Sequence, residues 1–182
     1  MFEMKKTKIT VLGIGNILFT DEGVGIRVVE RLQELYEFPL NVSVIDGGVL
    51  GLSLMHFIAE SDYLIVVDAI KNRGEPGSLY RLEGEDVPRR ILAKNSLHQV
   101  DFLETLTSCQ ILDKVPETVI LGVEPQDIET LGIELTPIIY SKVDSLIKMA
   151  LKELDRLGVD YYPKGEMENV SGHTRQDHQN RK

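Results

Sequence analysis

Residues 63–68 have the sequence Tyr-Leu-Ile-Val-Val-Asp, and they are the clearest indication of the fold class. The run from Tyr63 to Val67 lacks the alternation of apolar and polar residues that a strand with one face in water would show. A strand of this kind is covered on both faces, as in parallel sheets that lie between two layers of helices. The stretch therefore predicts a central, parallel strand in a three-layer fold.

Strand and helix patterns alternate on both sides of this run. β-branched and apolar residues predict strands at residues 7–12, 42–45, 63–67, 78–82 and 118–121. Apolar residues at helical spacing predict three helices that lie on the sheet, with the faces Val28, Val29, Leu32 and Leu35; Leu54, Phe57 and Ile58; and Phe102, Leu103 and Leu106. Residues 69–77 are too few for a helical crossover, so we expect the third and fourth strands to be antiparallel or non-adjacent.

The last predicted helix is followed by a polar tail. Thr136 fits the N-cap, Pro137 fits the first helical position, and Gly158 is expected to end the helix. Its apolar face consists of Ile139, Val143, Leu146, Ile147, Ala150, Leu151 and Leu154. From Pro163 onward almost nothing is apolar, so burial cannot offset the entropy cost of ordering. We expect one domain over residues 1–162 and a disordered tail over residues 163–182.

Length and charge limit the classes of function. A chain of 182 residues fits one domain, and a net charge of -9 without a Lys/Arg-rich run argues against nucleic-acid and membrane partners. The single cysteine, Cys109, excludes an internal disulfide, and it falls mid-helix without a predicted base beside it. Residues 1–7 are charged, and no stretch is apolar enough to span a bilayer. We expect a cytoplasmic protein.

Glycines and acids occur where three of the predicted strands end. Residues 13–16 follow the first strand, residues 46–48 follow the second, and Asp68 follows the third. Ligands of open α/β sheets bind at the carboxyl ends of the strands. Each of these residues alone is common in a turn, but their coincidence at one edge favours a functional site there.

Glu22, Asp68 and His98 form a candidate metal site at this edge. Glu22 lies near the start of a helix, whose dipole favours a carboxylate, although Asp21 beside it is an alternative there as the N-cap. Asp68 at the end of a rigid strand is also a common turn residue, and His98 alone also fits a helix cap. As a set, Glu, Asp and His suit a borderline divalent ion such as Ni²⁺ or Zn²⁺, with open positions for substrate. No H-E-x-x-H motif is present.

A nucleotide-binding domain is the alternative at the same edge. Residues 13–15 after a strand match the start of a dinucleotide-binding loop, with Asp46 as the ribose-binding acid. Against this, Leu18 occupies the third glycine position, and the acids at 21 and 22 would meet a pyrophosphate with negative charge.

Separated motifs across residues 9–158 together resemble the hydrogenase maturation endopeptidases. These motifs are Gly13-Ile14-Gly15-Asn16-Ile17-Leu18, Asp21-Glu22-Gly23-Val24-Gly25, Asp46-Gly47-Gly48, Asp68-Ala69, Ser96-Leu97-His98-Gln99, Gly122-Val123-Glu124-Pro125 and Leu135-Thr136-Pro137. The resemblance implies a three-layer α/β/α sandwich with a twisted five-stranded mixed sheet, of the phosphorylase/hydrolase-like kind. It also implies a cytoplasmic endopeptidase that removes the C-terminal extension of a nickel-iron hydrogenase large-subunit precursor after nickel insertion. We expect this endopeptidase to be a monomer.

The resemblance also assigns roles to residues. It makes Glu22, Asp68 and His98 the metal contacts, which complete the coordination of nickel presented by the precursor, and we expect zinc or cadmium to substitute in vitro. The candidate catalytic residues are Glu22, Asp46, Asp68 and His98, and the candidate substrate contacts are Asn16, Gly47 and Gln99. The metal then polarises the scissile carbonyl or activates a water, with Glu22 and Asp46 both candidates for the general base. A metalloprotease with its own ion and a metal-sensing maturation chaperone without peptidase activity remain alternatives.

Overall fold

The computed structural model describes residues 6–49, 55–84 and 116–165. In these ranges the chain forms a five-stranded sheet in the order β3-β1-β4-β6-β5. The strands are β1 (Ile9–Ile14), β3 (Val42–Gly48), β4 (Tyr63–Ala69), β5 (Leu79–Glu83) and β6 (Glu117–Val123). β1, β3, β4 and β6 run parallel, and β5 runs antiparallel to β6. The predicted mixed sheet is therefore confirmed.

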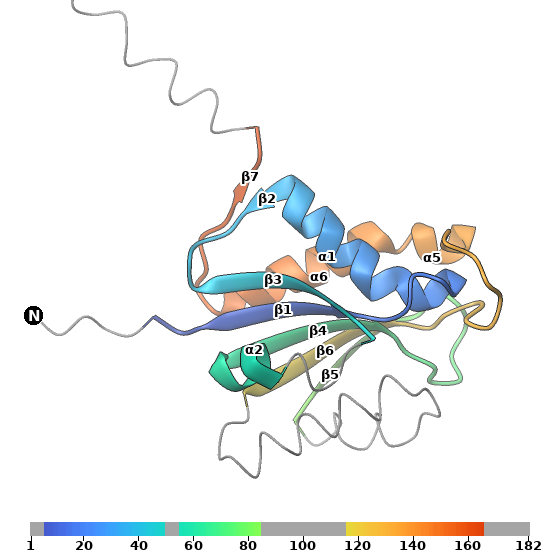
Figure 1. Cartoon of the computed structure of the whole chain (residues 1–182), viewed down its shortest axis with the longest axis horizontal. Coiled ribbons are helices and arrows are strands. Elements are labelled where there is room, and N and C mark those ends of the chain that lie inside the picture. Colours follow the sequence, from blue (N-terminus) through green and yellow to red (C-terminus); the bar gives the residue numbers. More distant parts are fainter. Residues whose placement is uncertain (1–5, 50–54, 85–115, 166–182) are drawn as a thin grey trace, which may run out of the picture.

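Helices cover both faces of the sheet, which gives the predicted three layers. α1 (Val24–Leu35) and α6 (Val143–Arg156) lie on one face, and α2 (Met55–Glu60) lies on the other (Figure 1). β4 is the central strand and separates two cores. Ile65 and Val67 belong to the core beneath α1 and α6, whereas Leu64 and Val66 pack with Ile58 of α2. All five side chains are buried, as the unbroken apolar run in β4 predicted.

β5 is the antiparallel member that the short connection predicted. It pairs with β6 rather than with β4, with Arg81 opposite Leu121. The connection from β4 to β5 crosses the carboxyl end of β6, where Ile70 N donates to Val123 O at 2.8 Å and Gly77 N donates to Glu124 O at 2.8 Å. A short loop therefore reaches the edge of the sheet without a crossover helix.

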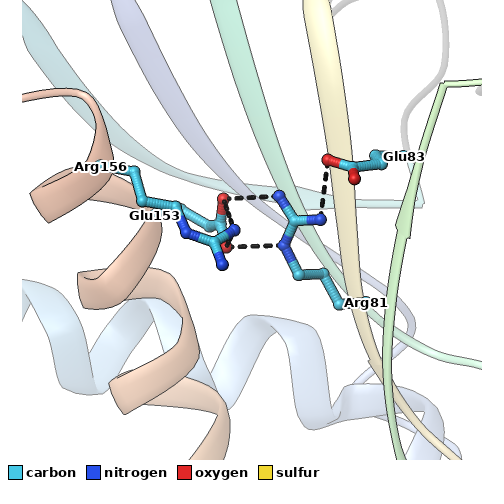
Figure 2. A network of polar contacts seen from close by, with 4 residues as sticks. All are labelled: Arg81, Glu83, Glu153 and Arg156. Carbon is cyan, nitrogen blue, oxygen red and sulfur yellow. Dashed lines mark hydrogen bonds and ion pairs between the residues drawn. The ribbon is translucent and has the colours of Figure 1, made fainter.

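An ion-pair network fastens the edge strand β5 to α6 (Figure 2). Glu153 is only 2% exposed, and its two carboxylate oxygens accept hydrogen bonds from Arg81 Nε at 2.8 Å and Arg81 Nη2 at 3.0 Å. Arg156 Nη1 donates to the same carboxylate at 2.9 Å, and Arg81 Nη1 pairs with Glu83 at 2.7 Å. The hydrogen bonds from Arg81 lower the pKa of Glu153. A buried carboxylate without such partners would destabilise the fold. The pair formed by Arg81 and Glu153 therefore holds β5 against α6.

The last helix is broken, which the sequence did not predict. A short helix α5 (Pro137–Tyr140) precedes α6, with Ser141 and Lys142 between them. Thr136 and Pro137 occupy the predicted N-cap and first helical positions, but the Thr136 side chain makes no capping hydrogen bond. Gly158 has a φ of +68°, a left-handed conformation that suits glycine just after the end of α6.

A second, two-stranded sheet joins the end of α1 to the C-terminal part of the fold. β2 (Tyr36–Glu37) pairs antiparallel with β7 (Tyr162–Pro163), and Lys164 N donates to Leu35 O at 2.7 Å. Pro163 and Lys164, which the sequence assigned to the tail, are thus held against α1. Residues 166–182 lie outside the described residues, as does the helix predicted after His98. None of the described helices has the length and apolar content that crossing a membrane requires.

Candidate active site

Parallel strands bring the predicted acids to one edge of the sheet. Gly13 near the end of β1 lies opposite Asp46 of β3 on one side and Val67 of β4 on the other. Asp68, the next residue of β4, lies opposite Gly122 of β6. Asp46 and Asp68 therefore flank the end of β1, from which the chain continues to Glu22. The convergence expected from the strand ends is present for these acids.

Glu22 is placed at this edge by η1, a 3-10 helix (Thr20–Gly23) that leads directly into α1. η1 contacts β4, the strand that carries Asp68. α1 approaches the sheet closely at Gly25, where an added Cβ would overlap the carbonyl oxygens of both Val67 and Ile14. The first turn of α1 therefore touches the backbones of β1 and β4 together, and Glu22 enters the site immediately before this turn.

The glycine after β1 serves packing within the protein. Gly15 has a φ of +142°, and a Cβ at this position would overlap the carbonyl oxygen of Glu22. The backbone of η1 thus occupies the close approach that the nucleotide-binding alternative reserves for a pyrophosphate. This geometry explains the glycine without a bound nucleotide.

Asp46 and Asn16 both shape turns at the edge. Asp46 is exposed, and its Oδ1 accepts a hydrogen bond from Gly48 N at 2.9 Å, while Asn16 Oδ1 accepts one from Leu18 N at 3.0 Å. The end of β3 is tied to the end of β1 because Gly15 N donates to Gly48 O at 3.0 Å. Gly47, the other predicted substrate contact in this loop, is buried. Each polar side chain thus has a structural role beside the one proposed for it.

Asp21 is a buried carboxylate, and the alternative role that its position suggested, that of the helix N-cap, is wrong. The N-cap residue of α1 is Gly23, so Asp21 does not cap that helix. Its side chain is fully buried and instead accepts hydrogen bonds from the backbone amides of Gln126, Asp127 and Thr136 and from the Thr136 hydroxyl, at 2.7 to 3.0 Å. These partners lie more than a hundred residues away along the chain, so local sequence gives no signal of them.

Glu124 is a second buried carboxylate, at the end of β6. It is 6% exposed, and its Oε2 accepts hydrogen bonds from Asn72 N and the Tyr80 hydroxyl, both at 2.7 Å. Burial, reinforced by this hydrogen bond, raises the pKa of Tyr80. The hydrogen bond from Asn72 N attaches the loop that follows Asp68 and β4 to the Glu124 carboxylate. Glu124 belongs to the motif Gly122-Val123-Glu124-Pro125, but this structural role was not predicted.

The third predicted metal ligand is not among the described residues. His98 lies in residues 85–115, together with Gln99, and the structure therefore does not place either side chain. Among residues 6–49, 55–84 and 116–165, no group of three or more His, Cys, Asp or Glu side chains is arranged to hold a metal ion. The described part of the site thus supplies carboxylates at one edge, Glu22, Asp46 and Asp68.

Comparisons with known proteins agree with this architecture. The family model described as hydrogenase maturation protease matches residues 26–153. The chain is 42% identical over 154 residues to the hydrogenase expression/formation protein HupD of Bradyrhizobium diazoefficiens, covering 84% of this chain and 80% of that protein. It is 36% identical over 159 residues to the hydrogenase 2 maturation protease of Escherichia coli, covering 86% of this chain and 96% of that protein.

A solved structure extends the similarity to three dimensions. The hydrogenase maturating endopeptidase HybD from E. coli aligns with a TM-score of 0.83 at 35% identity, covering 87% of this chain and 98% of that one. The family match covers most of the chain, and the similar proteins are matched over most of their own length. On this evidence, the chain belongs to the hydrogenase maturation protease family.

Proposed function

We propose that this protein is an endopeptidase that removes the C-terminal extension of a nickel-iron hydrogenase large-subunit precursor once nickel has been inserted. The observation that carries the proposal is the convergence of Glu22 and Asp68 at one edge of the sheet in a chain of this family. Carboxylates on a rigid strand and at a helix start are preorganised, which is what metal recognition requires.

In this proposal nickel is part of the substrate. Glu22, Asp68 and His98 contact the nickel that the precursor presents, and the metal either polarises the scissile carbonyl or activates the attacking water. Glu22 and Asp46 are the candidates for the general base. Asp46 lies on the opposite side of β1 from Asp68 and is exposed, so a bound segment of the precursor can reach it. Asn16, Gly47 and Gln99 are proposed to contact that segment.

The experiment mixes the purified protein with nickel-loaded precursor and follows release of the extension by gel shift and mass spectrometry. Glu22→Gln, Asp68→Asn and His98→Ala should each reduce cleavage by at least about a hundredfold, the scale on which loss of one electrostatic contact to a transition state is measured. If all three variants cleave at the wild-type rate, the site is misplaced.

A matched control lies immediately before the same strand. Asp62 lies at the opposite, amino-terminal end of β4, where it is exposed and accepts a hydrogen bond from Lys8 N at 2.8 Å. Asp62→Asn makes the same chemical change as Asp68→Asn at a position remote from the proposed site. It should retain wild-type cleavage, which separates an effect at the site from an effect of lost charge.

Two rival functions give different results in the same assay. A metalloprotease with its own ion would cleave nickel-free precursor as well, and would lose activity after dialysis against chelator. A metal-sensing chaperone would bind the precursor without releasing the extension. Cleavage confined to nickel-loaded precursor excludes both.

A further inference from the structure

We propose that Asp21 is a positioning residue, which sets the place of Glu22 by holding η1 against residues 126–136. The inference rests on the proposed function, because it assigns Asp21 an effect on cleavage through Glu22. Asp21 itself is fully buried and directed at the protein interior, so it is not a contact for the precursor.

The chemistry of the buried carboxylate supports this role. Its Oδ1 accepts a hydrogen bond from Thr136 N at 2.7 Å, and its Oδ2 accepts bonds from Gln126 N and Asp127 N, both at 2.9 Å, and from Thr136 Oγ1 at 3.0 Å. Within the described part of the chain these partners are neutral donors, and no cation is among them. A carboxylate can accept all four bonds, whereas an amide would present its own N–H groups to one of the donors.

Further hydrogen bonds join the same two segments. Thr20 N donates to Gly132 O at 2.8 Å, and Gly132 N donates to Leu18 O at 3.0 Å. The Thr20 hydroxyl and the Asp21 amide both donate to Asp127 O, at 2.5 and 3.1 Å. Residues 18–21 are thus joined to the loop between β6 and α5 by hydrogen bonds from both main-chain and side-chain groups. Four of these bonds are accepted by the Asp21 carboxylate.

Glu22 depends on this attachment because η1 is short. Its internal support includes the bond from Glu22 N to Phe19 O at 2.8 Å, and a single turn of 3-10 helix does not hold its shape alone. On the other side, η1 abuts β4 and α1. Loss of the Asp21 contacts therefore frees one side of the segment that carries Glu22. A displacement of about 1 Å at a reacting group is enough to slow a reaction by about a hundredfold.

Thr136 offers a mild test. Thr136→Val removes the hydroxyl bond to Asp21 and keeps the shape of the side chain, whereas Thr136→Ser keeps the bond. With nickel-loaded precursor, Thr136→Val should lower kcat by about tenfold with little change in KM, and Thr136→Ser should restore kcat to near the wild-type value. Asp21→Asn should lower kcat by about a hundredfold.

A remote variant controls for stability. Glu153→Gln disrupts another buried carboxylate network, near the C-terminal end of α6, where Glu153 bonds to Arg81 and Arg156. This variant should leave kcat unchanged at a temperature well below its Tm. If Glu153→Gln slows cleavage as much as Thr136→Val does, the effect is one of general destabilisation and the inference is wrong.

Hydrogen exchange gives a readout that does not depend on activity. The amides of Gln126, Asp127 and Thr136 should exchange faster in Asp21→Asn than in the wild type, together with those of residues 19–23. If Thr136→Val and Asp21→Asn cleave at the wild-type rate while Glu22→Gln does not, the proposed function stands and Asp21 is not a positioning residue. If Glu22→Gln also cleaves normally, Glu22 is not part of the site, and Asp21 then has no catalytic group to position. Unchanged exchange at residues 19–23 in Asp21→Asn would overturn the positioning role independently of any cleavage assay.

Discussion

Gly25→Ala should separate the first turn of α1 from the sheet and so displace the segment that carries Glu22. A Cβ at this position would lie 2.9 Å from Ile14 N and would overlap the carbonyl oxygens of Val67 and Ile14. Ordinary contact begins at 3.4 Å, so the helix has to withdraw by at least 3.4 − 2.9 = 0.5 Å, and by more from the two oxygens. All three atoms belong to the backbone of the central strands, which cannot rotate out of the way.

The size of the effect follows from two opposing contributions. Overpacking at a rigid site costs about 3 kcal/mol, at the upper end of the usual range. Alanine in place of glycine in a helix stabilises the folded state by about 1 kcal/mol. The free energy of unfolding should therefore fall by about 2 kcal/mol, which lowers the Tm of a chain of this size by about 4 to 8 °C.

Thermal unfolding followed by circular dichroism measures this shift, and Gly23→Ala is the matched control. Gly23 lies in the same motif with a φ of -74°, and its added Cβ would meet Ile17 Cα at 3.2 Å, a contact that a small shift relieves. Its Tm should fall by less than about 3 °C. The reasoning is refuted if Gly25→Ala melts within about 2 °C of the wild type, or if Gly23→Ala is the less stable variant.

Other parts of the structure give further predictions. Arg81→Met leaves Glu153 buried without its main partner, and it should lower the free energy of unfolding, measured in urea, by about 3 kcal/mol. The pKa of Glu153 in the folded protein lies below its ordinary 4.5. The loss of stability should therefore have its full size above pH 4.5 and shrink as the pH falls through the lowered pKa. Glu124→Gln should lower the pKa of Tyr80 toward 10.0 without reaching it, since burial persists, and ultraviolet titration of the phenol measures this shift. The purified protein should hold well under one metal ion per chain after dialysis against EDTA, because its predicted set of three ligands lacks a thiolate; a stoichiometric ion measured by mass spectrometry would favour a resident metal.

The strands and the edge that carries the site could be predicted because their signals are local. The apolar run in β4 has to be covered on both faces, and Asp68 at its end has to emerge beside the neighbouring parallel strand ends. The acids flanking β1 followed from this rule alone. The family resemblance of the motifs then assigned roles to Asp46 and Asp68. Both residues lie within residues 26–153, which the family model matches.

Features that depend on distant partners could not be predicted. Asp21 occurs between a turn and a helix, where an acid is ordinarily a cap, and its partner Thr136 was assigned to cap a different helix. The break between α5 and α6 interrupts an apolar face that continues across it. β2 and β7 contain two residues each, too few to show a period of any kind.

The most direct test of the central claim compares nickel-loaded and nickel-free precursor. Both forms carry the same cleavage sequence, so only the metal distinguishes them, and each is mixed with the wild-type protein and sampled over time on a gel. If Glu22, Asp68 and His98 bind nickel in the transition state, the nickel-free form loses that binding energy and should be cut at least about a hundredfold more slowly, equivalent to about 2.7 kcal/mol. Equal rates of cleavage for the two forms would show that nickel is not recognised and would contradict the proposed function.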